Sequence, residues 1–263
     1  MKAAFPALTL ALFAAGALAA QTTKSDIPRL PDGHPDLSGV WWGGADVGGR
    51  PAGGGGRGAG APGGRGGGRG PAPVTFQSLY TDEAKAHAKT LSDKDDPTLT
   101  CTNTAFGTLN VGMWDVGAVG QIVQTPKFVI FLTETYHSWQ IVPFDGRPAR
   151  DTVPPSNRGE AVGKWDGDTF VVNKTNFNDQ TWISAEGRVS FHSDELHVTE
   201  RYRRIDKDTL EIEATLEDPK VLTKPWVVPK QTLKLAPFDQ IIPLDCNSSD
   251  VKELIDAAQA PKK

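Results

Sequence analysis

The sequence has little cysteine, no excess of basic residues and no hydrophobic run long enough to cross a membrane. Among its 263 residues only Cys101 and Cys246 are cysteines. Neither has a cysteine or histidine at the short spacing of a thiolate metal site, which excludes a zinc site of that kind and a disulfide-rich scaffold. Lysine and arginine number 28 against 32 aspartates and glutamates, a net charge of −4. This balance argues against nucleic acid or an anionic membrane as the main partner.

The chain also lacks the motifs of the commonest hydrolases, zinc proteases and P-loop proteins. A G-x-G-x-x-G pattern occurs at Gly53, Gly55 and Gly58, but both of its flanks are glycine-rich, whereas a dinucleotide site needs a strand before it and a helix after it. Two short Asp-x-Asp copies, at 166–168 and 206–208, supply too few oxygens for calcium and are interpreted as hairpin turns. The sequence therefore predicts no metal and no cofactor.

The N-terminus has the pattern of a secretory signal peptide. A basic start at Met1-Lys2 precedes an apolar run over 8–18 and a small-x-small pattern at 17–19. That run is shorter than the ~20 residues needed to span a bilayer. The pattern predicts a cleaved signal peptide over residues 1–20 and a periplasmic or secreted protein. In an oxidising compartment two cysteines favour one Cys101–Cys246 disulfide, with two buried free thiols as the alternative.

Composition divides the mature chain into three parts. Residues 21–42 form a turn-rich lead and a first aromatic strand. Residues 43–73 hold sixteen of the 28 glycines and almost no apolar side chain, so we expect a disordered Gly/Arg-rich insertion. Residues 74–263 should form one β-rich domain together with 36–42.

Period-two patterns of apolar and β-branched residues predict seven strands in this domain, at 120–123, 128–136, 139–144, 169–174, 196–205, 209–216 and 232–235. Helical patterns cover 81–91 and 250–260. Because most connections are short, sequential strands should pair antiparallel. We therefore expect a mainly β fold, a single antiparallel β-barrel or strongly curved sheet of calycin-like or lipocalin-like type, with a short C-terminal helix.

The densest group of chemically active side chains lies at 192–203. His192 falls in the loop before a predicted strand and His197 at its start, while Glu200 faces the side opposite His197. We expect His192 and His197 to act as acid and base, with Glu134 or Glu200 as the orienting carboxylate. The alternatives are a loop histidine bonded to a neighbouring aspartate and a structural ion pair of Glu134.

Substrate-binding candidates are an anion anchor, Arg201, and a set of polar and aromatic residues near strand ends. That set is Trp182, Asp179, Trp139 and Tyr136. Tryptophans at such positions either fill the core or line a pocket for a flat ligand.

Several of these stretches together resemble a large family of secreted bacterial proteins of unknown function. The matching segments are 35–41, 144–147, 163–172, 192–201 and 218–226, and the similarity runs from Pro35 to about Asp250 apart from the insertion. The resemblance implies secretion and a single β-rich domain with a pocket. Trp139 stands where relatives often have arginine, and Ser184 where they often have an acid.

These observations favour an exported small-molecule enzyme that performs proton transfer without a cofactor, as a lyase, decarboxylase or isomerase, on a small aromatic substrate in a barrel pocket. The alternative is a non-catalytic periplasmic protein that binds a small ligand in the same pocket. Convergence of His192, His197 and an acid within hydrogen-bond reach would favour the enzyme.

Overall fold

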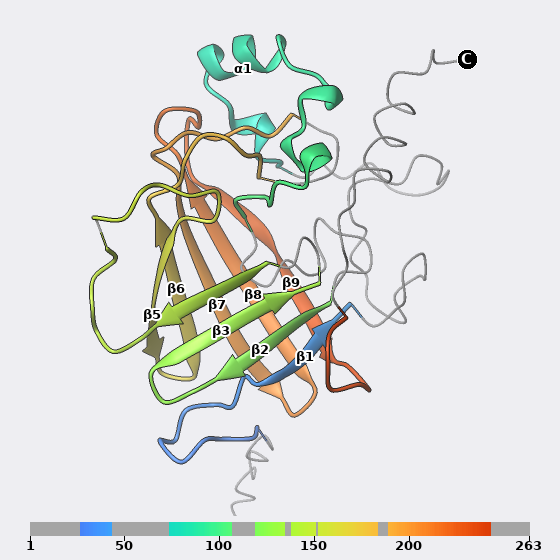
Figure 1. Cartoon of the computed structure of the whole chain (residues 1–263), viewed down its shortest axis with the longest axis vertical. Coiled ribbons are helices and arrows are strands. Elements are labelled where there is room, and N and C mark those ends of the chain that lie inside the picture. Colours follow the sequence, from blue (N-terminus) through green and yellow to red (C-terminus); the bar gives the residue numbers. More distant parts are fainter. Residues whose placement is uncertain are drawn as a thin grey trace, which may run out of the picture.

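The computed structural model describes residues 27–43, 74–106, 119–134, 138–150, 152–183 and 189–242 (Figure 1). The expected signal peptide, all of the Gly/Arg-rich insertion beyond its first residue, and the expected helix at 250–260 lie outside these residues. So do Tyr136 and Cys246. The predictions for these segments therefore stay predictions.

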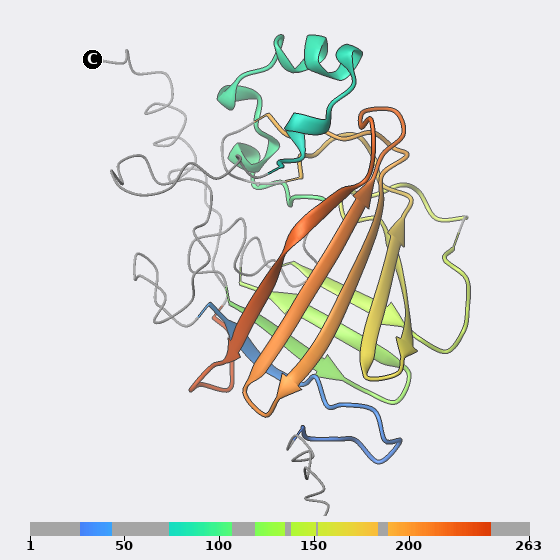
Figure 2. The ribbon, with the colours of Figure 1, turned by 180° about the vertical axis from the view of Figure 1, so that it is seen from behind.

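Within the described residues, nine antiparallel strands form one sheet. They are β1 (Gly39–Trp42), β2 (Gly120–Gln124), β3 (Phe128–Thr133), β4 (Trp139–Pro143), β5 (Glu160–Asp166), β6 (Thr169–Thr175), β7 (His197–Asp206), β8 (Thr209–Glu217) and β9 (Trp226–Leu235). Their order in the sheet is β4-β3-β2-β1-β9-β8-β7-β6-β5. The first four strands cross in front of the other five, as Figures 1 and 2 show from opposite sides. The short strand β1 joins the two groups by pairing with both β2 and β9.

The two edge strands, β4 and β5, approach each other at a seam. A Cβ atom added to Gly163 of β5 would lie 3.0 Å from Cγ1 of Val142 on β4 and 2.4 Å from Cζ of Phe170 on β6. Glycine is required at position 163 because these two side chains occupy the space that the Cβ of any other residue would fill. The sheet thus curls into a nearly closed antiparallel barrel, which confirms the predicted fold class.

Two apolar clusters and a polar layer fill the described interior. The first cluster lies inside the barrel and includes Trp41, Phe131 and Tyr202. The second lies towards the end that carries the helices and includes Tyr80 and Trp226. The polar layer includes the buried side chains of Lys174, Glu200 and Arg158. Lys174 and Glu200 follow the inward alternation of β6 and β7, so the strand pattern itself brings them inside.

Opposite ends of the barrel are covered differently. At one end the lead into β1 crosses below the strands in Figure 1, where Arg29 pairs with Asp168 (2.6 Å) and His34 stacks on Trp165 (4.5 Å between ring centroids). At the other end lie the helices, which are η1 (Gln77–Leu79), α1 (Asp82–Ala88), η2 (Asp93–Asp95) and η3 (Pro97–Thr100). Thr81 caps α1 by accepting from the Ala84 amide, as its sequence predicts. None of these described helices has the length and apolar character that a membrane span requires.

Two strands differ from the sequence prediction. β5 was not expected, because its inward position at Gly163 has no side chain and its outward positions include the apolar Val162, so it lacks a period-two apolar pattern. β9 begins six residues before the predicted 232–235, at Trp226. Pro229 obscures this early part, and the β8–β9 register shifts opposite it, between Ile212 and Ala214.

Candidate functional site

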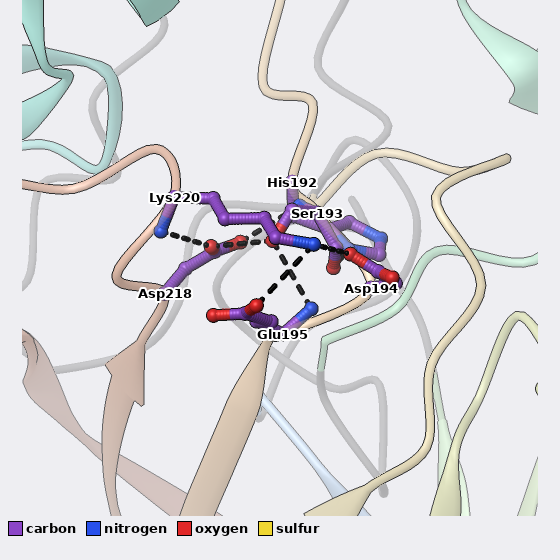
Figure 3. A network of polar contacts seen from close by, with 6 residues as sticks. All are labelled: His192, Ser193, Asp194, Glu195, Asp218 and Lys220. Atoms are coloured by element: carbon purple, nitrogen blue, oxygen red, sulfur yellow. Dashed lines mark hydrogen bonds and ion pairs between the residues drawn. The ribbon is translucent and has the colours of Figure 1, made fainter.

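A buried carboxylate holds the loop that leads into β7. Asp218 follows β8, is almost fully buried, and accepts hydrogen bonds from Ser193 N (2.7 Å) and Ser193 Oγ (2.6 Å). Figure 3 shows this pair with Lys220 reaching over it to Asp194 (2.6 Å) and Glu195 (3.3 Å). Asp218 therefore fixes the backbone of Ser193, the residue next to the candidate base His192.

His192 is held in one tautomer by this loop. Its Nδ1 lies 2.9 Å from the carbonyl oxygen of Ser193. Because a carbonyl oxygen only accepts, Nδ1 carries the proton, and Nε2 of the neutral ring keeps a lone pair. The ring is 2% exposed, and Nε2 has no hydrogen-bond partner among the described residues. Burial lowers the pKa of His192, with the Ser193 hydrogen bond opposing the shift.

The lowered pKa of His192 has a structural cause that its position in a loop does not reveal. The ring is buried against Phe177, with 5.9 Å between ring centroids, although the backbone around it is a loop. His192 is therefore a neutral base at pH 7.

His192 lines a pocket of about 390 Å³ at the end of the barrel that carries the helices. Its other polar lining residues are His87, Asp179, Gln180 and Ser193, and its apolar ones are Leu91, Pro97, Trp182, Phe191 and Val221. A backbone bridge between Trp182 and Phe191 ties the two sides of the long β6–β7 connection together. The pocket thus lies between this connection and the helical segment, beside the barrel mouth and not within the barrel as expected.

The expected convergence of His192 with His197 is wrong. His197 lies on the outer face of β7, where its Nδ1 is 3.2 Å from Oε2 of Glu217. Arg201 shares that face and pairs with Asp166 (2.8 Å), so it is no anion anchor for the pocket. The alternation of β7 explains both results, since Val198 and Tyr202 are the inward residues.

The remaining candidates are also apart from His192. Glu134 lies just after β3 and accepts a hydrogen bond from the backbone N of Ile242 (2.9 Å), so it anchors the last described residues. Trp139 is 63% exposed on the outer face of β4, opposite Leu132. Of the predicted substrate-binding residues that the structure describes, only Trp182 and Asp179 line the pocket with His192.

Glu200 belongs to the polar layer inside the barrel, beside a lysine that we had not singled out. Lys174 is 0% exposed, and its Nζ donates to the carbonyl oxygen of Ala105 (3.2 Å) and lies 5.4 Å from the centre of the Phe177 ring. Burial lowers the pKa of Lys174 to about 7, although the charge of Glu200 raises it. The sequence held a signal for this residue, because Lys174 shares its strand face with the apolar residues Phe170 and Val172.

His87 is a second residue that sequence reasoning passed over. It is on α1, and its ring meets the Phe191 ring edge-on at 4.7 Å, which places it in the pocket wall. Nothing in the local pattern of α1 indicates this role, because it depends on where the β6–β7 connection packs.

Cys101 is not a free thiol, and its expected partner Cys246 lies outside the described residues, so the predicted bridge stays a prediction. Within the described part of the chain, no three side chains of histidine, cysteine, aspartate or glutamate gather as metal ligands. No protein-family model, curated protein or solved structure matches the chain. The similarity to a family of secreted proteins therefore rests on the sequence motifs alone.

Proposed function

We propose that the protein is an exported small-molecule enzyme that catalyses proton transfer, with Nε2 of His192 as the general base. The observation that carries the proposal is the hydrogen bond from Nδ1 to the Ser193 carbonyl. It leaves the lone pair on Nε2 of a buried, neutral ring in a pocket wall. A base of this kind accelerates proton abstraction by about 10²- to 10⁴-fold.

The energetics of burial support a ligand at this position. A buried polar atom without a partner costs roughly 1–3 kcal/mol, and native structures rarely keep one without a reason. A substrate that donates a hydrogen bond to Nε2 removes this cost. The same contact places the substrate's proton on the atom that accepts it. Lyase, decarboxylase and isomerase reactions share this step and need no cofactor for it.

His192 and His197 provide a matched pair of variants. The experiment compares metabolite profiles of a strain lacking the gene with strains that express the wild type, His192→Gln or His197→Gln. We expect the wild type and His197→Gln to restore the profile and His192→Gln to lose at least about a hundredfold in turnover. Glutamine keeps size and hydrogen bonding at either position.

Two results would contradict the proposal. Full restoration by His192→Gln would remove His192 from the chemistry. Recovery of one unaltered compound from the purified protein, with no metabolite changed, would favour the non-catalytic binding protein.

A further inference from the structure

We propose that the pocket beside His192 binds a flat, positively charged molecule whose N–H groups donate hydrogen bonds to the pocket wall. The inference rests on the proposed functional site, because it uses the same pocket. It concerns binding alone, so it is tested without turnover. Three features of the wall carry it: charge, aromatic surface and hydrogen-bonding capacity.

The charge of the pocket is negative. Asp179 is the one carboxylate among the ten lining residues that the structure describes, and none of these ten is a lysine or arginine. The Asp179 carboxylate has neither an ion pair nor a hydrogen bond with any described residue. Lys220, on the loop after β8, is already paired with Asp194 and Glu195. A cationic ligand would give Asp179 a partner, whereas an anionic ligand would be repelled.

Lys174 does little to offset this negative charge. Its Nζ donates to Ala105 O and lies 5.4 Å from the centre of the Phe177 ring, which in turn lies 5.9 Å from the centre of the His192 ring. Its burial favours the neutral amine, as its lowered pKa indicates. Among the described residues, the pocket therefore has no strong cation behind its wall to hold a carboxylate or phosphate.

The aromatic lining favours a flat ligand. Trp182 and Phe191 are neighbours across the β6–β7 connection, and His87 meets Phe191 edge-on at 4.7 Å. The π-faces of tryptophan and phenylalanine attract planar rings and also cations. A volume of about 390 Å³ lies near the lower end of the range for small-molecule sites. The pocket therefore suits a molecule of one or two rings.

The polar lining presents two hydrogen-bond acceptors to a ligand. Nε2 of His192 holds a lone pair, and the Asp179 carboxylate holds several. Two such groups in one wall are satisfied by a ligand with at least two N–H donors. An amidine or a protonated amino-heterocycle combines these donors with a flat shape and a positive charge.

Three near-isosteric probes separate the contributions of charge and shape. Benzamidine, benzamide and benzoate share one ring and a planar substituent, with charges of plus one, zero and minus one. Their dissociation constants are measured on the full mature protein by titration of the Trp182 indole signal in NMR spectra. We expect benzamidine to bind about fivefold more tightly than benzamide, the size of one exposed ion pair, and benzoate to bind most weakly.

Asp179→Asn tests the source of this preference. Asp179 is exposed, so the substitution leaves the fold unaffected, and we expect the benzamidine-to-benzamide ratio to fall to about one. Asp194→Asn changes the net charge equally in the same connection, yet its carboxylate faces Lys220, so the ratio should stay at the wild-type value.

The proposal is overturned if benzoate binds as tightly as benzamidine, if Asp194→Asn lowers the ratio as much as Asp179→Asn does, or if no probe shifts the Trp182 signal saturably. These results are separate from the proposed reaction. A protein that passes the binding test while His192→Gln retains full turnover has the inferred ligand class and a different function.

Discussion

The wild-type protein is expected to become more stable as the pH rises above 7. Replacing Lys174 by methionine is expected to remove this rise. The amine is fully buried, and burial lowers its pKa to about 7 from the ordinary 10.5. Between these two values the unfolded chain binds a proton that the folded chain does not. The free energy of unfolding therefore increases with pH across this window and loses that increase as the pH falls through 7.

The magnitude follows from the size of the window. Each pH unit in which only the unfolded state is protonated adds about 1.4 kcal/mol to the free energy of unfolding. Between pH 8.0 and 9.5 the wild type should therefore gain roughly 2 kcal/mol. The neutral amine also leaves Arg158 and Glu200 as one cation and one anion in the polar layer, which is the cheapest charge state for a buried group of three.

The assay is urea unfolding followed by tryptophan fluorescence at pH 8.0, 8.5, 9.0 and 9.5. The free energy of unfolding of Lys174→Met should change little with pH over this range, whereas that of the wild type should rise. Lys164→Met, in which an exposed lysine of β5 is lost, should keep the wild-type slope. A wild type whose stability does not change over this range would refute the reasoning even if Lys174→Met failed to fold.

Two further predictions concern the seam and the cysteines. Gly163→Ala should lower the free energy of unfolding by about 1–3 kcal/mol in urea, because its Cβ would displace Phe170 and Val142, whereas Gly43→Ala, with no atom within 4 Å of the new Cβ, should change it little. Equal effects of the two substitutions would contradict the described seam. Non-reducing peptide mass spectrometry of protein from an oxidising compartment should find Cys101 joined to Cys246, and recovery of both as free thiols would reject the bridge.

Much of the barrel was predictable because strands such as β3, β4 and β7 alternate buried and more exposed residues. The alternation of β7 placed His197 and Glu200 on opposite faces, and the apolar residues Val198 and Tyr202 identify the inner one. The same rule, applied to β6, would have found Lys174. β5 was missed because of Gly163. Phe170 and Val142 leave no room for a Cβ there, so this inward position carries no apolar side chain to mark a strand.

The pocket was harder to predict than the barrel. His192 was correctly placed in a loop, but its burial depends on Phe177 and on how Asp218 holds Ser193. His87 and Asp179 are more than ninety residues apart in the chain and meet only when the helical segment packs on the β6–β7 connection. No local periodicity encodes such a contact, because it is decided by long-range packing.

The position of β1 has a consequence for how the chain folds. The strand is made first, yet one of its two neighbours is β9, the last strand, and Trp41 pairs with Leu235, 194 positions later. The hairpins β2–β3–β4, β5–β6 and β7–β8 close over short loops, the longer β6–β7 connection joins the last two, and all of them can form while the chain is still emerging. The two halves of the sheet join only when β1 pairs with β9, which closes the longest loop between paired strands. A large sequence separation between contacting strands is typical of slowly folding proteins. Until then both sheet halves expose pairing edges, so a chain that stops before Trp226 should fold into two unjoined and aggregation-prone halves.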